Sequence, residues 1–199
     1  MHRSKSQVRT SILAARRAVP AHVHDAEAAD LAGHLGAAVK PGSTVCGYVP
    51  VGSEPGSLTL IDTVLQQGAT VLLPVAREDP DGTPQPLQWG RYRPGELIPA
   101  PFGLREPPPP WLPPDAVAQA SLVLVPALAV DRRGVRLGRG AGFYDRTLHL
   151  ARDAALVAVV RDDEILDRLP AEPHDVRMTH ALTPHRGLVA LASGINQPG

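Results

Sequence analysis

The segment that decides the fold is 121-SLVLVPALAVDRRGVRLGRGAGFYD-145, in which an apolar run leads into a glycine-rich loop. Ser121 to Val130 is almost unbroken in its apolar character, which predicts a strand at the centre of a sheet and buried on both faces. Downstream, Gly138, Gly140 and Gly142 permit positive φ and close approach of a ligand, while successive N–H groups attract anions. We therefore predict a phosphate-binding loop at the carboxyl end of a central strand, where open α/β sheets place ligands.

Charged residues strengthen this interpretation of the loop. Arg136 and Arg139 can neutralise phosphate, and Asp145 can hold a metal ion that accompanies it. The pattern fits neither the Walker run, which needs Gly-Lys-Ser/Thr, nor the dinucleotide fingerprint, whose glycines are spaced differently. An ordinary surface turn is the alternative, but the position after a central strand favours nucleotide chemistry.

Segments on both sides of this region alternate between helical and strand patterns. Apolar spacing predicts helices over residues 6–19, 25–39, 57–67 and 145–153, and strands over 44–51, 69–75, 156–160 and near Leu182. A further strand over 87–92 closes a hairpin, whereas 94–114 holds too much proline for regular structure. We predict an α/β fold: a single domain over residues 1–199, with a central, mostly parallel sheet flanked by helices and a small hairpin.

Composition limits the possible partners and compartments. The 20 basic and 20 acidic residues balance to a net charge of zero, so no global field recruits nucleic acid or an anionic membrane. Cys46 is the single cysteine, which excludes an internal disulfide and suits a reducing compartment. Apolar stretches are too short for a membrane span, and no long apolar surface stripe is evident. We expect a cytoplasmic monomer that binds small molecules and neither nucleic acid nor membrane.

Several separated segments, taken in order, carry a family resemblance. They are 5-KSQVR-9, 48-YVP-50 with Glu54, 73-LPV-75, 102-FGLREP-107, 125-VPALAVD-131, 134-GVRLGRGAGFYDR-146, 169-LP-170 and 174-HD-175. Together they resemble the 5-formyltetrahydrofolate cyclo-ligase family, also called methenyltetrahydrofolate synthetase. The resemblance implies an α/β fold of the kind shared with sugar-phosphate isomerases and CoA transferases. It also implies ATP as co-substrate, Mg²⁺ and a reduced folate.

The resemblance implies a specific reaction. The N5-formyl oxygen of 5-formyltetrahydrofolate attacks the γ-phosphate of ATP, N10 closes on the activated carbon, and phosphate leaves to give 5,10-methenyltetrahydrofolate. Negative charge spreads over oxygens during phosphoryl transfer, so cations and oriented N–H groups carry most of the catalysis.

The family's functional positions carry over to named residues of this chain. Lys5 and Arg9, one helical turn apart, are expected to bind ATP together with the loop residues Arg136, Leu137, Gly138, Arg139, Gly140, Ala141, Gly142, Phe143 and Tyr144. Arg139, Tyr144 and Asp145 are the expected catalytic residues. Asp145 and Asp175 are the expected ligands of Mg²⁺, a hard ion that prefers oxygen. A solvated helix face is the alternative for Lys5 and Arg9, and a helix N-cap is the alternative for Asp145.

The folate site is expected at Val49, Glu54 and Tyr144. A carboxylate at Glu54 can accept hydrogen bonds from the amino and ring N–H groups of the pterin. Trp89, Phe102 and Trp111 are possible stacking faces for the folate rings. The scattered histidines lack a convincing zinc ligand set and are expected on the surface.

Three departures from the family pattern keep two alternatives open. Ala141 stands where many members carry lysine, Thr179 stands where a second acid often follows Asp175, and 55-PGS-57 replaces an acid and a threonine after Glu54. One alternative is a paralogue that binds nucleotide or folate without catalysis. The other is a sugar-phosphate isomerase of the same fold, because fold does not fix function.

Overall fold

Helices and strands alternate along most of the chain, and this order produces a layered α/β architecture. The computed structural model describes residues 4–173 and 175–192. The α-helices are α1 (Lys5–Arg17), α2 (Ala21–Ala38) and α3 (Leu58–Gln66). The strands are β1 (Thr44–Cys46), β2 (Thr70–Val75), β3 (Gln88–Arg91), β4 (Ile98–Pro99), β5 (Arg105–Glu106), β6 (Leu122–Pro126), β7 (Ala129–Asp131), β8 (Arg136–Leu137), β9 (Ala155–Val159), β10 (Ile165–Leu166), β11 (His180–Thr183) and β12 (Gly187–Ala190). Short 3₁₀ helices are η1 (Pro101–Gly103), η2 (Pro114–Gln119), η3 (Leu148–Leu150) and η4 (Asp162–Glu164).

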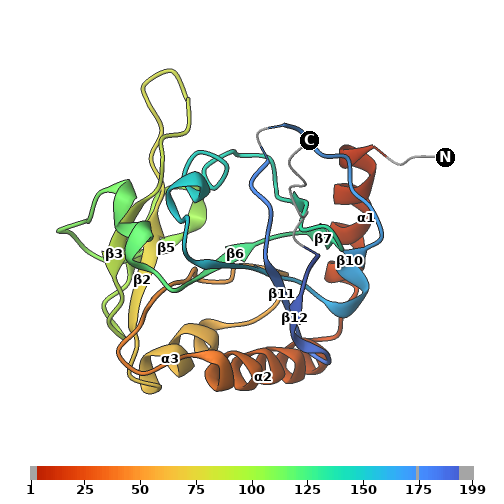
Figure 1. Ribbon diagram of the computed structural model, residues 1–199, viewed down its shortest axis with the longest axis horizontal. Coiled ribbons are helices and arrows are strands. Elements are labelled where there is room, and N and C mark those ends of the chain that lie inside the picture. The colour runs from red at the N-terminus through yellow and green to blue at the C-terminus, as the bar shows by residue number, and fades with distance from the viewer. Residues whose placement is uncertain (1–3, 174, 193–199) are drawn as a thin grey trace, which may run out of the picture.

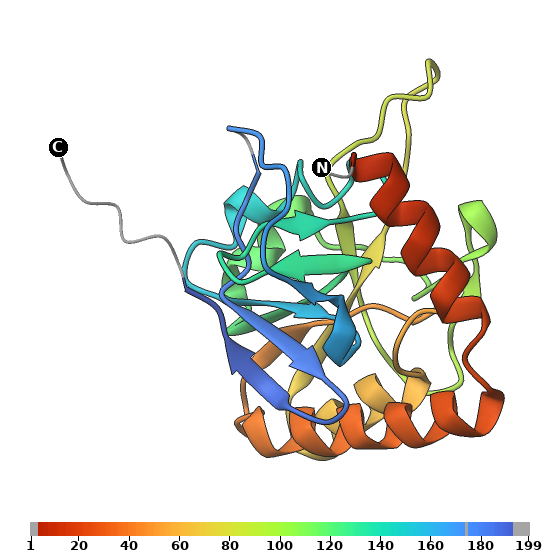
Figure 2. The same cartoon turned by 90° about the vertical axis from the view of Figure 1, so that its right-hand side faces the viewer.

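A seven-stranded sheet forms the middle layer, in the order β12-β11-β9-β6-β1-β2-β3 (Figure 1). Its inner strands pair in parallel, whereas the edge strands β3 and β12 pair antiparallel with their neighbours. The mostly parallel sheet and the hairpin formed by β2 and β3 are therefore confirmed. The connection between β2 and β3 projects beyond the sheet in both ribbon views (Figures 1 and 2).

The two faces of the large sheet are covered differently. On one face, α2 and α3 bury Leu31, Leu35 and Leu60 against sheet residues such as Leu124 and Val157. This layer lies below the sheet in Figure 1. The opposite face is packed by η2, η3 and the connecting segments, with a core that includes Val117, Leu148, Trp89 and Met178. The central strands are consequently buried on both sides, as a parallel sheet requires.

Local sequence signals set the residues at which the first two helices begin. The Ser4 hydroxyl oxygen accepts a hydrogen bond from the backbone N–H of Gln7, and the side-chain oxygen of Gln7 accepts one from the backbone N–H of Ser4, which forms a capping box at the start of α1. Pro20 is the N-cap of α2 with φ −62°, so this helix begins four residues before the predicted start at residue 25. A proline that precedes a helix causes no loss because its missing N–H has no helical partner.

A second, three-stranded sheet in the order β10-β7-β8 lies beside the large one and supports α1. Val8 of α1 packs in a cluster with Ala129, Val135, Leu137 and Leu169. Figures 1 and 2 show α1 standing alongside β7 and β10, away from α2 and α3. The opposite face of α1 therefore lies toward the loop that follows β8.

The prediction of one strand from Ser121 to Val130 is wrong. The chain forms β6, turns at residues 127–128, and enters β7, which belongs to the smaller sheet. Pro126 has no N–H with which to extend the first ladder. Leu128 instead donates to the carbonyl of Leu137, which directs the chain toward β8. Similarly, the strand predicted over 44–51 ends at Cys46, and residues beyond Gly47 leave the sheet.

The helix predicted over residues 145–153 is also wrong. Turns occupy 143–147, followed by the single 3₁₀ turn η3. Thr147 donates its hydroxyl to the carbonyl of Phe143 and accepts the N–H of Leu87, and such side-chain bonds compete with helix formation. The proline-rich segment 94–114 holds more regular structure than expected, namely β4, β5 and η1. In the described part of the chain, no helix combines the length and apolar character needed to cross a bilayer.

A buried ion pair fastens α1 to the rest of the molecule. Arg16 Nε lies 2.7 Å from Glu164 Oε1, and Arg16 Nη2 lies 2.7 Å from Glu164 Oε2. The same Nη2 donates to the carbonyl of Ala127 at 2.8 Å. The side chains of Arg16 and Glu164 are only 1% and 6% exposed. Loss of one partner would therefore leave an uncompensated charge away from water.

We expect Glu164→Gln to lower the free energy of unfolding by about 3 kcal/mol, because it leaves the Arg16 charge buried without its carboxylate. Urea denaturation followed by circular dichroism measures this change. The control is Asp167→Asn, which breaks the exposed Arg132–Asp167 pair and should leave the midpoint unchanged. Equal midpoints for all three proteins would contradict the assignment of Arg16 as the anchor.

Cys46 gives a second test of the fold. Burial raises the pKa of its thiol from 9.0 to about 12, so at pH 8 almost no reactive thiolate is present. We expect the native protein to react very slowly with an aromatic disulfide reagent at pH 8. In denaturant, Cys46 should react at once, and the reagent should release one equivalent of its aromatic thiolate per protein chain. Rapid reaction of the native protein would show that β1 opens readily.

Candidate functional site

A pocket of about 740 Å³ opens at the carboxyl ends of the central strands. Val49 follows β1, Pro74 lies in β2 near its end, and Pro126 ends β6, and all three line it. This is the edge at which α/β sheets place their ligands. The structure therefore forms a pocket at the edge where the sequence predicts a site.

The structure brings all of the residues assigned from the sequence to ATP, folate, metal binding and catalysis to this one pocket. Its lining includes Lys5, Arg9, Val49, Glu54, Arg136, Leu137, Gly138, Arg139, Gly140, Ala141, Gly142, Phe143, Tyr144, Asp145 and Asp175. They come from α1, from the loop after β1, from β8 and the loop that follows it, and from the segment before β11. Their individual roles in binding and catalysis stay predictions.

The glycine loop leaves β8 and turns back over the pocket. Gly140 and Gly142 have φ values of 104° and 84°, a region that other residues enter only with strain. Arg9 Nε donates to the carbonyl of Gly138 at 2.9 Å and so ties α1 to the loop. No helix follows at 145, so any anion held here depends on loop N–H groups and side-chain cations and not on a helix terminus.

Each arginine of the loop already holds a carboxylate. Arg136 Nη2 lies 2.7 Å from Asp145 Oδ1, and Arg139 Nε lies 3.3 Å from Glu54 Oε1. Asp145 is therefore paired with an arginine, and the prediction of an alternative helix-capping role fails because no helix begins there. The pocket is close to charge neutrality before a ligand enters, so an anionic ligand must compete with internal acids.

Lys5, the first residue of α1, is also paired with acidic side chains. Its Nζ lies 3.1 Å from Glu172 Oε1 and 3.9 Å from Asp175 Oδ2. Asp175 also accepts the backbone N–H of Glu172 at 2.8 Å, which orders this segment. His174, part of the motif noted in the sequence, lies outside the described residues. Lys5 and Arg9 thus face the pocket and do not form a purely solvated helix surface.

Glu54 is held in place by its own loop. Its Oε2 accepts the N–H of Val51 at 3.0 Å, and its carbonyl oxygen lies 2.9 Å from His24 Nε2. The Glu54 side chain is 11% exposed. Ser57 accepts the N–H of Thr59 and caps α3, so the altered stretch after Glu54 keeps a helix-capping function. Glu54 is a fixed acceptor with one oxygen turned toward Arg139.

The other two departures from the family pattern have different consequences. Ala141 is exposed on the glycine loop and lines the pocket, so the missing cation would have faced a ligand. Thr179 instead accepts the N–H of Leu156 and donates to its carbonyl, which binds the residue before β11 to β9. Thr179 is therefore structural in this chain.

The aromatic candidates separate clearly. Phe102 is 57% exposed, lines the pocket and packs against Phe143 with ring centroids 5.8 Å apart. Trp89 is fully buried in the core, and Trp111 lies beneath the guanidinium of Arg77 at 4.5 Å. Of the three possible stacking faces, Phe102 alone is among the described lining residues.

Tyr144 lies under the glycine loop. The guanidinium carbon of Arg136 is 5.8 Å from its ring centroid. Burial raises the pKa of the Tyr144 hydroxyl well above its usual value, with Arg136 opposing and Glu54 and Cys46 adding to the shift. The phenol is therefore neutral at physiological pH and can donate a hydrogen bond.

Sequence reasoning assigned no role in the site to several residues that line this pocket, among them Arg16 and Tyr48. Arg16 lies two turns beyond Arg9 on α1, a spacing that places both on one helix face. Tyr48 belongs to the matched 48-YVP-50 segment, but nothing in the sequence distinguishes its hydroxyl from that of a core tyrosine. The signal for Tyr48 is a structural one.

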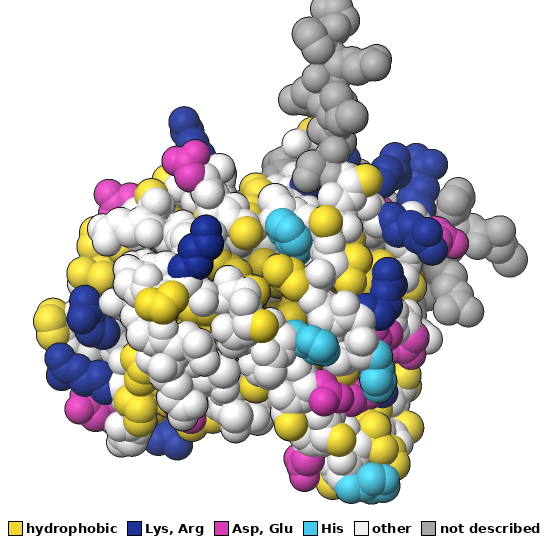
Figure 3. Space-filling view, turned by 60° about the horizontal axis from the view of Figure 1, so that its bottom comes forward, with side chains coloured by type: hydrophobic (Ala, Val, Ile, Leu, Met, Phe, Trp, Pro, Cys, Tyr) yellow, Lys and Arg dark blue, Asp and Glu magenta, His cyan; other side chains and the backbone are white. Residues whose placement is uncertain are grey.

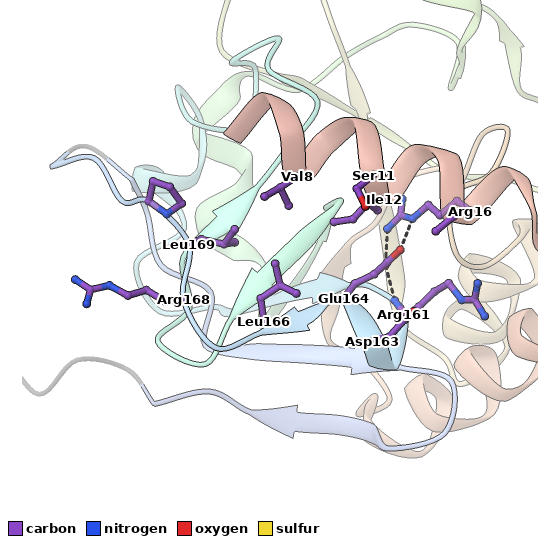
Figure 4. A pocket seen from close by; sticks show the side chains of 12 residues that line it. Val8, Ser11, Ile12, Arg16, Arg161, Asp163, Glu164, Leu166, Arg168 and Leu169 are labelled. Atoms are coloured by element: carbon purple, nitrogen blue, oxygen red, sulfur yellow. Dashed lines mark hydrogen bonds and ion pairs between the residues drawn. The ribbon is translucent and has the colours of Figure 1, made fainter. Parts of the chain in front are cut away.

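A second hollow of about 730 Å³ lies on the other side of α1 (Figure 4). Val8 and Ile12 face Leu166 and Leu169 across it, and the Arg16–Glu164 pair closes one end. None of the described residues expected at the site, from either α1 or the glycine loop, lines it. The histidines in Figure 3 are scattered over the surface, and the described residues contain no group of three or more metal-ligating side chains.

Comparison with known proteins gives the family. The model of the 5-formyltetrahydrofolate cyclo-ligase family matches residues 1–184. The chain belongs to the 5-formyltetrahydrofolate cyclo-ligase family. It is 66% identical over 190 residues to the 5-formyltetrahydrofolate cyclo-ligase of Mycolicibacterium smegmatis, covering 95% of this chain and 98% of the relative. The Escherichia coli K12 cyclo-ligase is 28% identical, over 72% of this chain and 79% of its own length.

Solved structures agree with the family on the fold. The 5,10-methenyltetrahydrofolate synthetase of Aquifex aeolicus superposes with a TM-score of 0.72 at 24% identity, covering 98% of this chain and 96% of that one. The Mycoplasma pneumoniae synthetase gives 0.68 at 20% identity, with coverage of 92% and 98%. The resemblance noted in the sequence and the α/β fold class are thereby confirmed, and this cyclo-ligase family member is an enzyme of the ligase class.

Proposed function

We propose that the chain converts 5-formyltetrahydrofolate to 5,10-methenyltetrahydrofolate, with Mg²⁺ and ATP, and releases ADP and phosphate. One observation carries the proposal: a single pocket places a cation-flanked glycine loop directly against the fixed acid Glu54. Its volume of about 740 Å³ lies in the range of small-molecule sites. Phosphate-binding and pterin-binding groups are thus close enough to serve one reaction.

The nucleotide would lie between α1 and the glycine loop. Lys5 supplies a point charge, whereas Arg9, Arg136 and Arg139 offer planar forks that match phosphate oxygens. Arg9 donates through Nε to Gly138, so its remaining N–H groups can reach a phosphate while it fixes the loop. When ATP binds, phosphate oxygens would replace the carboxylates of Asp145 and Glu54 as the partners of Arg136 and Arg139.

Asp145 and Asp175 suit Mg²⁺. Both carboxylates line the pocket, and Mg²⁺ usually takes one or two protein carboxylates and completes its shell with water and phosphate. When bound, the ion supplies further neutralisation of phosphate charge.

The folate would bind beside Val49 and Tyr144, with Glu54 accepting from the pterin N–H groups. Phe102 lies at the mouth of the same pocket. Arg139 of the phosphate-binding loop lies 3.3 Å from Glu54, so a pterin on Glu54 would bind next to the residues that we assign to phosphate. Proximity of the two substrates is one contribution that we assign to the protein, beside stabilisation of charge.

The reaction then needs charge stabilisation more than proton transfer. The formyl oxygen attacks the γ-phosphorus and ADP leaves; N10 attacks the activated carbon, the C–O bond breaks, phosphate departs, and the N10 proton is lost to solvent. We assign Arg139 to the developing phosphoryl charge, Tyr144 to hydrogen bonding at the formyl end, and Asp145 to the metal. We also expect a cytoplasmic monomer, as the sequence predicts.

The first test is an assay of methenyl product, which absorbs near the boundary of the ultraviolet and visible ranges, with and without MgATP. Product that forms only with ATP supports the ligase. Binding without turnover would point to the non-catalytic paralogue, and activity on a sugar phosphate without ATP to the isomerase.

Asp145→Asn should lower kcat at least tenfold and raise the Mg²⁺ concentration needed for half-maximal rate, because a neutral amide is a weaker ligand for a hard cation. A magnesium titration of the steady-state rate measures both. Asp153→Asn, an exposed acid on the segment after η3, is the matched control and should behave as the wild type. An unaltered magnesium dependence in the Asp145 variant removes this residue from the metal site.

Glu54→Gln should raise KM for 5-formyltetrahydrofolate between about tenfold and a hundredfold, the loss expected for charge-assisted hydrogen bonds. KM for ATP should not rise, because the substitution also releases Arg139. Steady-state kinetics with each substrate varied in turn separates the two effects. Glu96→Gln, on an exposed loop, is the control. A rise confined to KM for ATP would reverse the assignment of the two subsites.

A further inference from the structure

Two tyrosine hydroxyls at the floor of the pocket have no hydrogen-bond partner in the described part of the chain. They belong to Tyr48 and Tyr144, and both oxygen atoms are buried. Most buried hydroxyls in folded proteins are hydrogen-bonded, and an exception calls for an explanation. Both residues line the pocket, so a bound ligand can supply the missing partner.

The two phenols come from different loops that line the same pocket. Tyr144 follows the glycine loop, and the guanidinium carbon of Arg136 lies 5.8 Å from its ring centroid, which suits its assignment to the formyl end of the folate. Tyr48 follows β1 and begins the loop that ends at Glu54. Tyr48 therefore belongs with the acid that we assign to the folate.

Tyr48 is a permanent neutral donor. Its residue is 4% exposed, and burial raises the pKa of its hydroxyl well above the usual value. The nearby charges of Glu54 and Glu164 raise this pKa further, Tyr144 acts in the same direction, and Arg16 opposes them. The Tyr48 hydroxyl therefore carries its proton at neutral pH.

A neutral donor beside Glu54 complements a pterin ring. The carboxylate can only accept, and it suits the 2-amino and N3–H groups. The adjacent C4 carbonyl of the same ring is an acceptor and needs a donor. One phenol O–H supplies that donor without adding charge.

We propose that Tyr48 is a specificity-determining residue of the folate site: its hydroxyl donates a hydrogen bond to the C4 carbonyl oxygen of the pterin ring while Glu54 accepts from the neighbouring N–H groups. The inference rests on the proposed function and adds a residue to it. It also explains why a polar atom is retained at the edge of the apolar cluster formed by Leu31, Leu60 and Leu73.

The test compares Tyr48→Phe with the wild type by titration calorimetry. We expect the Kd for 5-formyltetrahydrofolate to rise about tenfold, with the Kd for a non-hydrolysable MgATP analogue unchanged. The thermal midpoint should not fall, because phenylalanine keeps the ring and removes an unpartnered hydroxyl. A purely structural tyrosine would show the opposite pattern.

Tyr92→Phe is the matched control. Tyr92 is 2% exposed and donates its hydroxyl to Asp62 at 2.5 Å. It does not belong to the described lining of the pocket. Its substitution should lower the thermal midpoint and leave folate binding as in the wild type.

Three outcomes overturn the inference. If the wild type converts 5-formyltetrahydrofolate and Tyr48→Phe binds this folate with the same Kd as the wild type, the inference fails and the proposed function stands. If Tyr48→Phe raises the Kd for the folate and the Kd for the MgATP analogue by the same factor, the hydroxyl shapes the pocket and does not select the pterin. If the wild type binds no folate, the proposed function and the inference fail together.

Discussion

The buried bond from Arg16 to Glu164 and to the carbonyl of Ala127 is the constraint on which the site depends. It fixes α1 to the end of β6, at the point where the chain leaves the large sheet. Lys5 and Arg9 lie on the same helix, so their reach over the glycine loop follows from this attachment. A helix held only by its apolar face could slide, whereas a charge with one partner cannot move without leaving that partner. The position of two pocket cations is thus set by a third that lies deeper.

Charge pairing inside the pocket gives the site a second property. Arg136 holds Asp145 and Arg139 holds Glu54 before any ligand is present. An anion that bound alone would pair with the arginines but leave Asp145 and Glu54 without partners in a partly buried pocket. A cation that bound alone would pair with these acids and leave the arginines without partners. A ligand that combines phosphate with a metal ion, and a second that brings N–H donors, satisfies both sets of groups together.

The sequence predicts the elements whose signals are local and misses those created by tertiary pairing. The helical spacing of Lys5 and Arg9 and the glycines at 138, 140 and 142 point to residues that the structure brings to one pocket, because backbone freedom and helix periodicity belong to the residues themselves. The split of Ser121–Val130 into β6 and β7 depends on pairing with β8 and β10, which are two residues long. The turns after Tyr144 depend on Thr147 bonding across to Leu87. The unpartnered hydroxyl of Tyr48 depends on everything packed around it.

The contrast between the two tryptophans has a practical use. Trp89 is enclosed in the core opposite α2 and α3, whereas Trp111 lies against a guanidinium near the surface. Intrinsic fluorescence should therefore contain a short-wavelength component from Trp89 that shifts to the red when the sheet comes apart. Since neither indole belongs to the described lining of the pocket, this emission reports the integrity of the interior independently of occupancy by substrates.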